Sequence, residues 1–337
     1  MITEPAPRLA PTPSQPSPAG SVALVVLGAG RSGTSALARG LQALGVDLGE
    51  RLRPPGGKNP TGFFEDRDLL AFNKRRLKPA LGIRGHSVRL IDDAQWHTPT
   101  LRALQQEAVQ IIRTRFGNSP LWGYKYARTL RFLPFWLDVY RAAELDVRFV
   151  MALRNPLSVG RSRGQLNPER GRITWTGLEW LVNVVPYFRE LRAYPLVLVD
   201  YDALMEAPAE QLARIARHLN LPADATTPAA IAEYAQQFLR PGMRHSRFGP
   251  QDLRGDADLP ALVSEAYGWL HRLAHDEIAP DDQRFWAAWG HIEASLRDLA
   301  PILREMDWLR LRLEQARWNP FTPLLALRQL WRDYRSI

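Results

Sequence analysis

The chain has 337 residues, 45% of them hydrophobic, which is enough to bury a sizeable core and excludes a disordered or fibrous protein. It contains no cysteine, so disulfides, thiolate catalysis and cysteine-ligated metals are excluded. The formal net charge of +9 favours anionic partners, such as a nucleotide, an acidic glycan, a nucleic acid or an acidic membrane face, without choosing among them.

The first twenty residues contain six prolines and lack the apolar run that a secretory signal needs. We therefore expect residues 1–20 to form a disordered tail. No segment approaches the roughly 20 apolar residues of a membrane span, so we expect no transmembrane segment and a cytoplasmic location.

The segment 22–27 is continuously apolar and is followed at once by glycines, a pattern typical of a strand buried on both faces of a parallel sheet. After Gly33, leucines recur at helical spacing as far as Gly45, which can take the left-handed conformation at a helix end. Backbone N–H groups and small hydroxyl side chains between a strand and a helix bind anions. We therefore predict a phosphate-binding loop, formed by Gly30, Arg31, Ser32, Gly33, Thr34 and Ser35.

The spacing of Gly28 and Gly33 matches the start of an ATP-binding P-loop, but Thr34 stands where that loop has its essential lysine. A kinase needs the lysine and a magnesium ion to hold the β- and γ-phosphates. A donor with one phosphate bonded to a sulfuryl group has less charge to neutralise, and Arg31 inside the loop can reach the transferring group. The alternative is a glycine-rich turn that only closes the strand against the helix.

Further along the chain, strand-like segments alternate with helical ones. The strands are expected at 121–125, 147–153 and 196–200, and the helices at 99–116, 130–143 and 175–191. This alternation predicts an α/β fold, a P-loop-like doubly wound parallel sheet flanked by helices, whose ligand lies beyond the carboxyl ends of the strands.

From about residue 260 onward only helical patterns occur, which predicts an α/β core over 21–255 and a helical C-terminal part over 256–337. The segment 324–334 is basic and amphipathic, and packing on the core is favoured over binding to a membrane surface. His271 and His275 share one helical face, but no carboxylate lies between them as in a metalloprotease motif. We therefore assign no metal.

The run Arg31-Ser-Gly-Thr-Ser35 resembles the 5′-phosphosulfate loop of the sulfotransferase superfamily. Arg154, at a predicted strand end, is followed eight residues later by Ser162, which resembles the 3′-phosphate signature of that family. Asn155 replaces the usual aspartate. Alone, this pair would suit a surface arginine and an unrelated serine. Its position after a buried strand favours a doubly phosphorylated nucleotide, and the resemblance implies the donor 3′-phosphoadenosine 5′-phosphosulfate.

Two more segments resemble parts of the same family and imply catalytic residues. Lys125, at the end of the segment 121–125, would contact the sulfuryl group, although a strand-end lysine in solvent is the alternative. Glu65 lies in a Gly-Phe-Phe-Glu segment, where aromatic neighbours can raise the pKa of a carboxyl group, and is the candidate general base. His86 is the reserve candidate for the base. Alternatively, Glu65 could be an acidic residue at a helix N-terminus that the helix dipole stabilises, but Asp66 fits that role better.

The basic segment 240–247 resembles a late nucleotide-contacting loop of the family, in which Arg244 and Arg247 would bind the 3′-phosphate or an acidic acceptor; a solvated loop is the alternative. We expect a sulfotransferase that moves a sulfuryl group to a hydroxyl or amine of an acceptor. The sequence does not decide whether this acceptor is a glycan, a lipid or a small molecule. Nucleic acid is an unlikely partner. The competing functions are a small-molecule kinase and a noncatalytic nucleotide- or nucleic-acid-binding protein.

Overall fold

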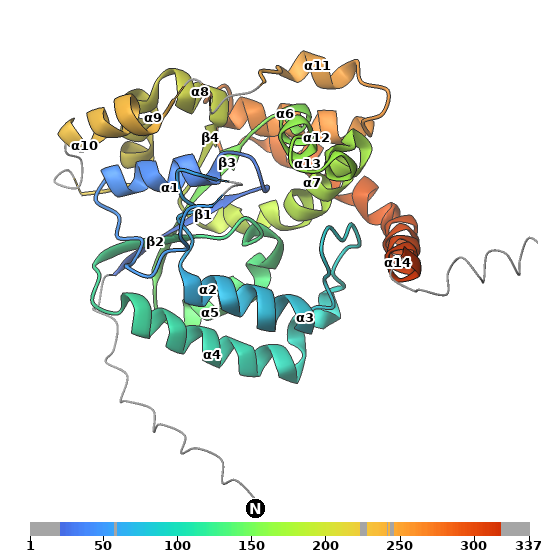
Figure 1. Ribbon diagram of the computed structural model, residues 1–337, viewed down its shortest axis with the longest axis horizontal. Coiled ribbons are helices and arrows are strands. Elements are labelled where there is room, and N and C mark those ends of the chain that lie inside the picture. Colours follow the sequence, from blue (N-terminus) through green and yellow to red (C-terminus); the bar gives the residue numbers. More distant parts are fainter. Residues whose placement is uncertain (1–20, 57–58, 223–227, 241, 243–245, 318–337) are drawn as a thin grey trace, which may run out of the picture.

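The computed structural model describes residues 21–56, 59–222, 228–240, 242 and 246–317 (Figure 1). The predicted tail over 1–20, Arg244 and the predicted helix over 324–334 lie outside the described residues. No helix in the described ranges is both long and apolar enough to cross a membrane.

Four parallel strands form the central sheet, in the order β2-β1-β3-β4. The strands are β1 (Val22–Gly28), β2 (Leu121–Lys125), β3 (Asp146–Leu153) and β4 (Leu196–Asp200). Val22 pairs with both Leu121 and Asp146, so β1 is an interior strand. The four predicted strands are confirmed to within one residue at each end. All four carboxyl ends lie at one edge, because the strands are parallel.

Helices cover both faces of the sheet, as a doubly wound fold requires (Figure 1). The helices of one face are α2 (Arg67–Phe72), α4 (Pro99–Phe116), α5 (Leu133–Ala142), α7 (Ile173–Phe188), α12 (Ala261–Ala274) and α13 (Gln283–Asp298). The helices of the other face are α1 (Thr34–Ala43), α8 (Tyr201–Glu206) and α9 (Pro208–His218). The remaining helices are α3 (Lys78–Ala80), α6 (Pro156–Gly164), α10 (Pro228–Glu233), α11 (Pro250–Arg254) and α14 (Ala300–Arg317).

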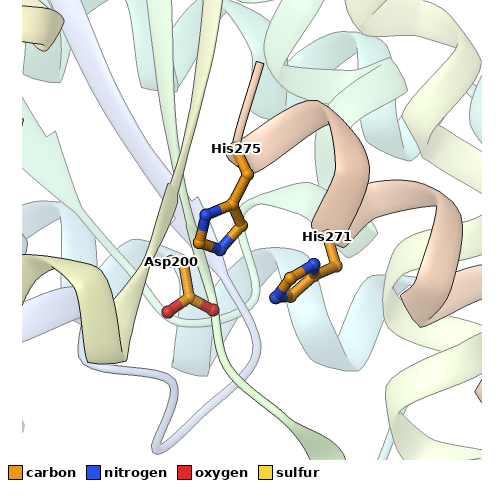
Figure 2. Close-up of side chains that lie close together, drawn as sticks. All are labelled: Asp200, His271 and His275. Atoms are coloured by element: carbon orange, nitrogen blue, oxygen red, sulfur yellow. The ribbon is translucent and has the colours of Figure 1, made fainter. Parts of the chain in front are cut away.

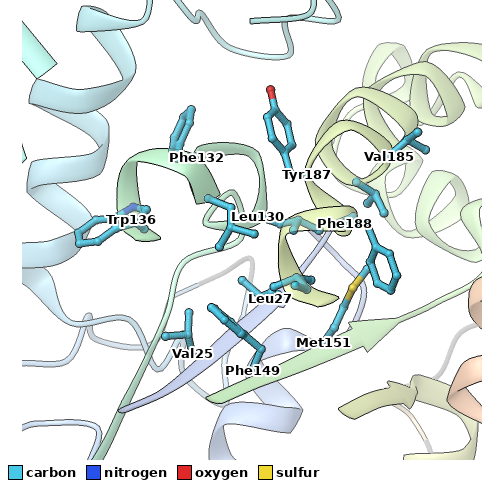
Figure 3. Packing of buried hydrophobic residues seen from close by; sticks show 14 of the residues in the cluster. Val25, Leu27, Leu130, Phe132, Trp136, Phe149, Met151, Val185, Tyr187 and Phe188 are labelled. Carbon is cyan, nitrogen blue, oxygen red and sulfur yellow. The ribbon is translucent and has the colours of Figure 1, made fainter. Parts of the chain in front are cut away.

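The side chains of β1 alternate between two hydrophobic cores. Val25 and Leu27 face the larger core, together with Phe149 of β3 (Figure 3). Leu24 and Val26 face the smaller core under α1. Successive side chains of a strand point to opposite faces, so a strand covered on both faces must be apolar throughout. This explains the continuous apolar run that the sequence shows at 22–27.

The helical C-terminal part packs on the α/β core through large aromatic side chains. Trp289 of α13 is fully buried, and its ring lies 5.0 Å from that of Phe188 in α7. Pro301 lies in the first turn of α14, where a missing N–H costs nothing, so it begins this helix and does not bend it. The predicted helical region is confirmed, whereas the boundary at residue 255 stays a prediction.

Two predicted helices have different limits. The segment predicted as one helix over 130–143 begins with a 3₁₀ turn at Leu130–Phe132 and continues as α5, which has Pro134 in its first turn. The helix predicted over 175–191 spans 173–188 and is followed by a 3₁₀ turn. The helix predicted over 99–116 matches α4, and Gly45 has the predicted left-handed conformation, with φ of 82°.

Candidate functional site

The loop between β1 and α1 is held in a single shape by close contacts. Gly28 has φ of 137°, and a Cβ there would lie 2.7 Å from the carbonyl oxygen of Ala152 in β3. The Oγ of Ser32 donates a hydrogen bond of 2.6 Å to the carbonyl oxygen of Ala29. Arg31 lies in the left-handed region with φ of 76°, a conformation that is costly for a residue with a side chain and is kept only where surrounding contacts impose it.

Helix α1 begins directly after this loop with no side-chain cap. Gly33 is its N-cap residue, with φ of 89°, and a Cβ at this position would lie 2.1 Å from the ring of Tyr201. A glycine N-cap provides no side-chain oxygen to accept hydrogen bonds from the first N–H groups of the helix. These N–H groups and the positive end of the helix dipole favour an anion in the loop.

The two segments that the sequence singles out as anion-binding lie in direct contact. The Nε of Arg31 donates a hydrogen bond of 3.1 Å to the Oγ of Ser162 in α6. Arg154, which directly follows β3, donates from Nη1 to the carbonyl oxygen of Arg31 at 3.1 Å. The guanidinium of Arg154 also lies 4.4 Å from the centre of the Tyr201 ring. One ligand at the carboxyl edge of β1 and β3 can therefore contact both segments.

Positive charge is concentrated at this point of contact. Arg154 is only 5% exposed. Burial, and then the charge of Arg154, lowers the pKa of the Arg31 guanidinium, and Arg163 adds to this effect. Like charges held close together in a partly buried site create a strong field that favours an anionic ligand.

Asn155 takes the place of the aspartate that is usual in the family signature, and its contacts explain why the asparagine can stand there. Its side-chain oxygen accepts a hydrogen bond of 2.9 Å from the N–H of Leu157 and caps α6. Its Nδ2 donates to the carbonyl oxygen of Gly249 at 2.9 Å, which an aspartate cannot do. Asn155 therefore connects the start of α6 to Gly249, which lies two residues after the basic segment 240–247. In that segment Arg247 is exposed and forms an ion pair of 2.8 Å with Glu206.

Lys125 at the end of β2 reaches the same loop from the side of α1. Its Nζ donates to the Oγ of Ser35 at 3.2 Å and to the carbonyl oxygen of Phe63 at 2.8 Å, and it lies 3.3 Å from Oε1 of Glu65. Lys125 is 4% exposed. Burial lowers the pKa of its ammonium group, and the charge of Glu65 opposes this effect. The alternative of a strand-end lysine in solvent is therefore wrong.

Both carboxylate oxygens of Glu65 face cations. Its Oε2 lies 3.1 Å from Nη1 of Arg53, whose guanidinium stacks 3.6 Å from the centre of the Phe63 ring. The neighbouring residue Asp66, and not Glu65, caps α2, because its side chain accepts hydrogen bonds from the N–H groups of residues 68 and 69. Glu65 is therefore a buried carboxylate beside Lys125, and Lys125 also contacts Ser35.

A second buried carboxylate, Glu179 of α7, was not singled out by the sequence pattern. Its Oε2 accepts hydrogen bonds from Nη1 of Arg163 at 2.9 Å and from Nδ1 of His86 at 3.0 Å. Burial alone would raise the pKa of Glu179, but Arg163 and then His86 bring this pKa down to about 2. The reserve base His86 is therefore held by an ionised carboxylate.

A model of the "Sulfotransferase family" matches residues 23–225, which is more than half of the chain. The chain belongs to the sulfotransferase family. It is therefore a transferase enzyme, and the resemblance that the loop motifs carry is confirmed.

Three solved structures are similar to this sulfotransferase. The sulfotransferase domain of the Synechococcus PCC 7002 olefin synthase is 16% identical, with a TM-score of 0.40, over 86% of this chain and 98% of that chain. The sulfotransferase domain of the curacin biosynthetic pathway is 15% identical, with a TM-score of 0.37, over 64% and 78%. The sulfotransferase STF1 from Mycobacterium tuberculosis H37Rv is 18% identical, with a TM-score of 0.37, over 64% and 76%. A search of curated proteins finds no match.

The sulfotransferase also has a basic cavity of about 520 Å³ beside Glu65. Two residues near Glu65 form part of the cavity wall: Arg53, which forms an ion pair with Glu65, and Phe63, which lies two residues before it in the sequence. Burial, and then the charge of Arg53, lowers the pKa of Lys74 in the same wall. Among the described residues that line this cavity, four are basic and none is acidic: Arg53, Arg67, Lys74 and Arg75.

Proposed function

We propose that this sulfotransferase uses 3′-phosphoadenosine 5′-phosphosulfate as its donor and transfers the sulfuryl group to a hydroxyl or amine by in-line displacement. The observation that carries the proposal is the contact between the two anion-binding segments, in which Arg31 bonds Ser162 and Arg154 bonds the backbone of Arg31. Two such segments at one sheet edge suit a nucleotide with phosphates on both the 3′ and the 5′ positions of its ribose. A nucleotide with a single phosphate would leave one segment without a ligand.

Each segment takes one end of the donor. The 5′-phosphosulfate lies in the loop 30–35, where backbone N–H groups and the hydroxyls of Thr34 and Ser35 donate hydrogen bonds. The 3′-phosphate is bound by Arg154 and Ser162, because a buried arginine makes strong charge-assisted bonds to phosphate. Arg244, which lies outside the described residues, stays a predicted contact of the same phosphate.

The transfer needs a base for the proton of the acceptor and positive charge beside the oxygens of the sulfuryl group. Glu65 accepts the proton of the acceptor hydroxyl, whose oxygen then forms a bond to sulfur while the bond from sulfur to the 5′-phosphate oxygen breaks. The leaving adenosine 3′,5′-bisphosphate takes the electron pair of that bond. Lys125 and Arg31 stabilise the charge that develops on the sulfuryl and bridging oxygens. The hydrogen bond from Lys125 to Ser35 is what supports its place beside the donor.

The basic cavity beside Glu65 is the proposed entrance for the acceptor. Four cations in its wall favour an acceptor that carries negative charge, such as an acidic glycan, over a neutral lipid or phenol. Replacing Lys74 by Ala should raise the KM for an acidic glycan acceptor and leave the KM for a neutral phenol unchanged. Equal effects on both acceptors would argue against this entrance.

Calorimetry on the unmodified enzyme tests the donor. We expect adenosine 3′,5′-bisphosphate to bind at least tenfold more tightly than AMP or ATP, because only this nucleotide contacts both segments. Incubation with the phosphosulfate donor and a broad acceptor panel should release adenosine 3′,5′-bisphosphate. ATP turnover without use of the phosphosulfate donor would instead favour the kinase, and salt-dependent binding without transfer would favour a noncatalytic binding protein.

A further inference from the structure

A group of three metal-ligand side chains lies at the end of β4, away from Glu65 and Lys125. Asp200 ends this strand, and His271 and His275 lie one helical turn apart near the end of α12 (Figure 2). One ligand atom of each side chain lies within 4.8 Å of the ligand atoms of the other two. We propose that Asp200, His271 and His275 bind one divalent transition-metal ion.

The two histidines are arranged as a pair that can bind one ion. Residues four apart lie on the same face of a helix, and the two imidazole rings stack with their centres 4.2 Å apart. The spacing of the two histidines alone predicts no metal site, because no carboxylate lies between them. Asp200 supplies the carboxylate from another part of the chain.

Asp200 is fixed in position by its own backbone contacts. Its Oδ1 accepts hydrogen bonds from the N–H groups of Asp202 at 2.9 Å and Ala203 at 3.0 Å, so the side chain caps α8 and cannot turn away. The residue is 6% exposed. Among these three described side chains, no hydrogen bond or ion pair joins one to another. A buried carboxylate that faces two imidazoles without bonding either one is well placed to share a cation with them.

The spacing of the three side chains is close to that of a metal site. Bonds of about 2.1 Å in tetrahedral geometry place neighbouring ligand atoms about 3.4 Å apart. Because the ligand atoms lie within 4.8 Å of one another, they must approach by at most about 1.4 Å. The exposed His275 is the C-cap residue of α12 and has room to make this movement. Two imidazoles and one carboxylate suit zinc, cobalt or nickel, whereas magnesium and calcium prefer oxygen ligands alone.

The surroundings leave room for a further ligand and suggest a structural role. A cavity of about 380 Å³ adjoins the three side chains and can hold a water as the fourth ligand. A bound ion would join α12 to the turn between β4 and α8. Tyr201 begins α8 and lies against Arg154, so the ion would hold the wall of the proposed nucleotide site without contacting the donor. This inference does not depend on the proposed donor or acceptor.

Cobalt titration of the full chain tests the site. After treatment with a chelator and removal of any affinity tag, Co²⁺ should bind with one ion per chain and produce visible absorption bands typical of a coordinated ion. Replacing His275 by Gln, or Asp200 by Asn, should weaken Co²⁺ binding at least tenfold. The exposed His275 can be changed without affecting the core, and an asparagine at 200 keeps the cap of α8. The matched control is His291→Gln, on the exposed side of α13, which should bind Co²⁺ like the unchanged chain.

Thermal unfolding with Zn²⁺ provides an independent measurement. Zn²⁺ should raise the Tm of the unchanged chain and of the His291→Gln variant, because a ligand of the folded state stabilises it. It should not raise the Tm of the His275→Gln variant. The proposal would be overturned if the unchanged chain showed no saturable Co²⁺ binding. It would also be overturned if the His275→Gln variant and the Asp200→Asn variant each bound Co²⁺ as tightly as the unchanged chain.

Discussion

Replacing Arg154 by Ala should remove most of the selectivity for a 3′-phosphate. Arg154 is 5% exposed, and its guanidinium donates a hydrogen bond to the carbonyl oxygen of Arg31 and lies over the ring of Tyr201, so it has a fixed direction. Truncating a charged partner in a buried site costs about 2 to 5 kcal/mol. Since about 1.4 kcal/mol corresponds to a tenfold change in Kd, binding of adenosine 3′,5′-bisphosphate should weaken by about 30-fold or more.

The fold should tolerate this substitution better than the ligand does. Arg154 contributes to the lowered pKa of Arg31, which means that the two positive charges repel each other in the folded chain. Removing one of them relieves the repulsion and offsets part of the lost packing on Tyr201. We therefore expect a small change in Tm together with a large change in nucleotide affinity.

Calorimetry with two nucleotides separates a lost 3′-phosphate contact from general damage to the site. Binding of AMP, which has no 3′-phosphate, should change little in the Arg154→Ala variant, so the ratio of the two affinities should fall. Arg141→Ala is the matched control, because Arg141 is an exposed arginine on α5, and its ratio should stay unchanged. If both nucleotides weaken equally, or if neither does, Arg154 does not bind the 3′-phosphate and the reasoning fails.

Three further predictions concern catalysis and stability. Replacing Glu65 by Gln should lower kcat by about 10² to 10⁴ while leaving nucleotide affinity unchanged, and His86→Gln should have the smaller effect; the reverse order in steady-state assays would make His86 the base. The pKa of Glu179 falls from 4.5 to about 2 on folding, so its ionised form contributes stability that is present above about pH 4.5 and is lost as the pH falls towards 2. The free energy of unfolding of Glu179→Gln, measured with denaturant, should lack this acid-induced loss of about 3 kcal/mol; an equally steep loss in both proteins would contradict the assigned ion pair. Replacing Trp289 by Ala should cost about 3 to 5 kcal/mol in one cooperative transition, because its ring packs on Phe188 of the core; two separate transitions in calorimetry would instead mean that the C-terminal part unfolds by itself.

The strands and the loop after β1 could be predicted because their signals are local. A strand covered on both faces must be apolar at every position, and the run from Val22 to Leu27 meets this condition without reference to the rest of the chain. The loop and the start of α1 follow directly in the sequence. Parallel pairing of β1 with β3 then places the residues after both strands at the same edge, which is why Arg31 and Arg154 could be predicted to share one ligand.

The ion pairs of the site could not be predicted, because their partners are at least 12 residues apart in the sequence and do not share a helix or a strand. Nothing near Glu179 in the sequence identifies Arg163 and His86 as its partners, and nothing near Glu65 identifies Arg53 as the cation that stacks on Phe63. Tyr201 did leave a signal that could have been used. It directly follows a buried strand of the sheet, the same kind of position that marked Arg154.

The sequence by itself determined the α/β sheet and the order of the two predicted anion-binding segments, since both depend on contacts between residues that are near in the chain or in paired strands. Only the tertiary structure decided which polar and charged side chains from separate segments lie close together. It brought Glu65 to Lys125, and it brought Asp200 at the end of β4 to His271 and His275 at the end of α12. Pairwise electrostatics depends on distance in space, and distance in space between remote residues is fixed only when the helices pack on the sheet.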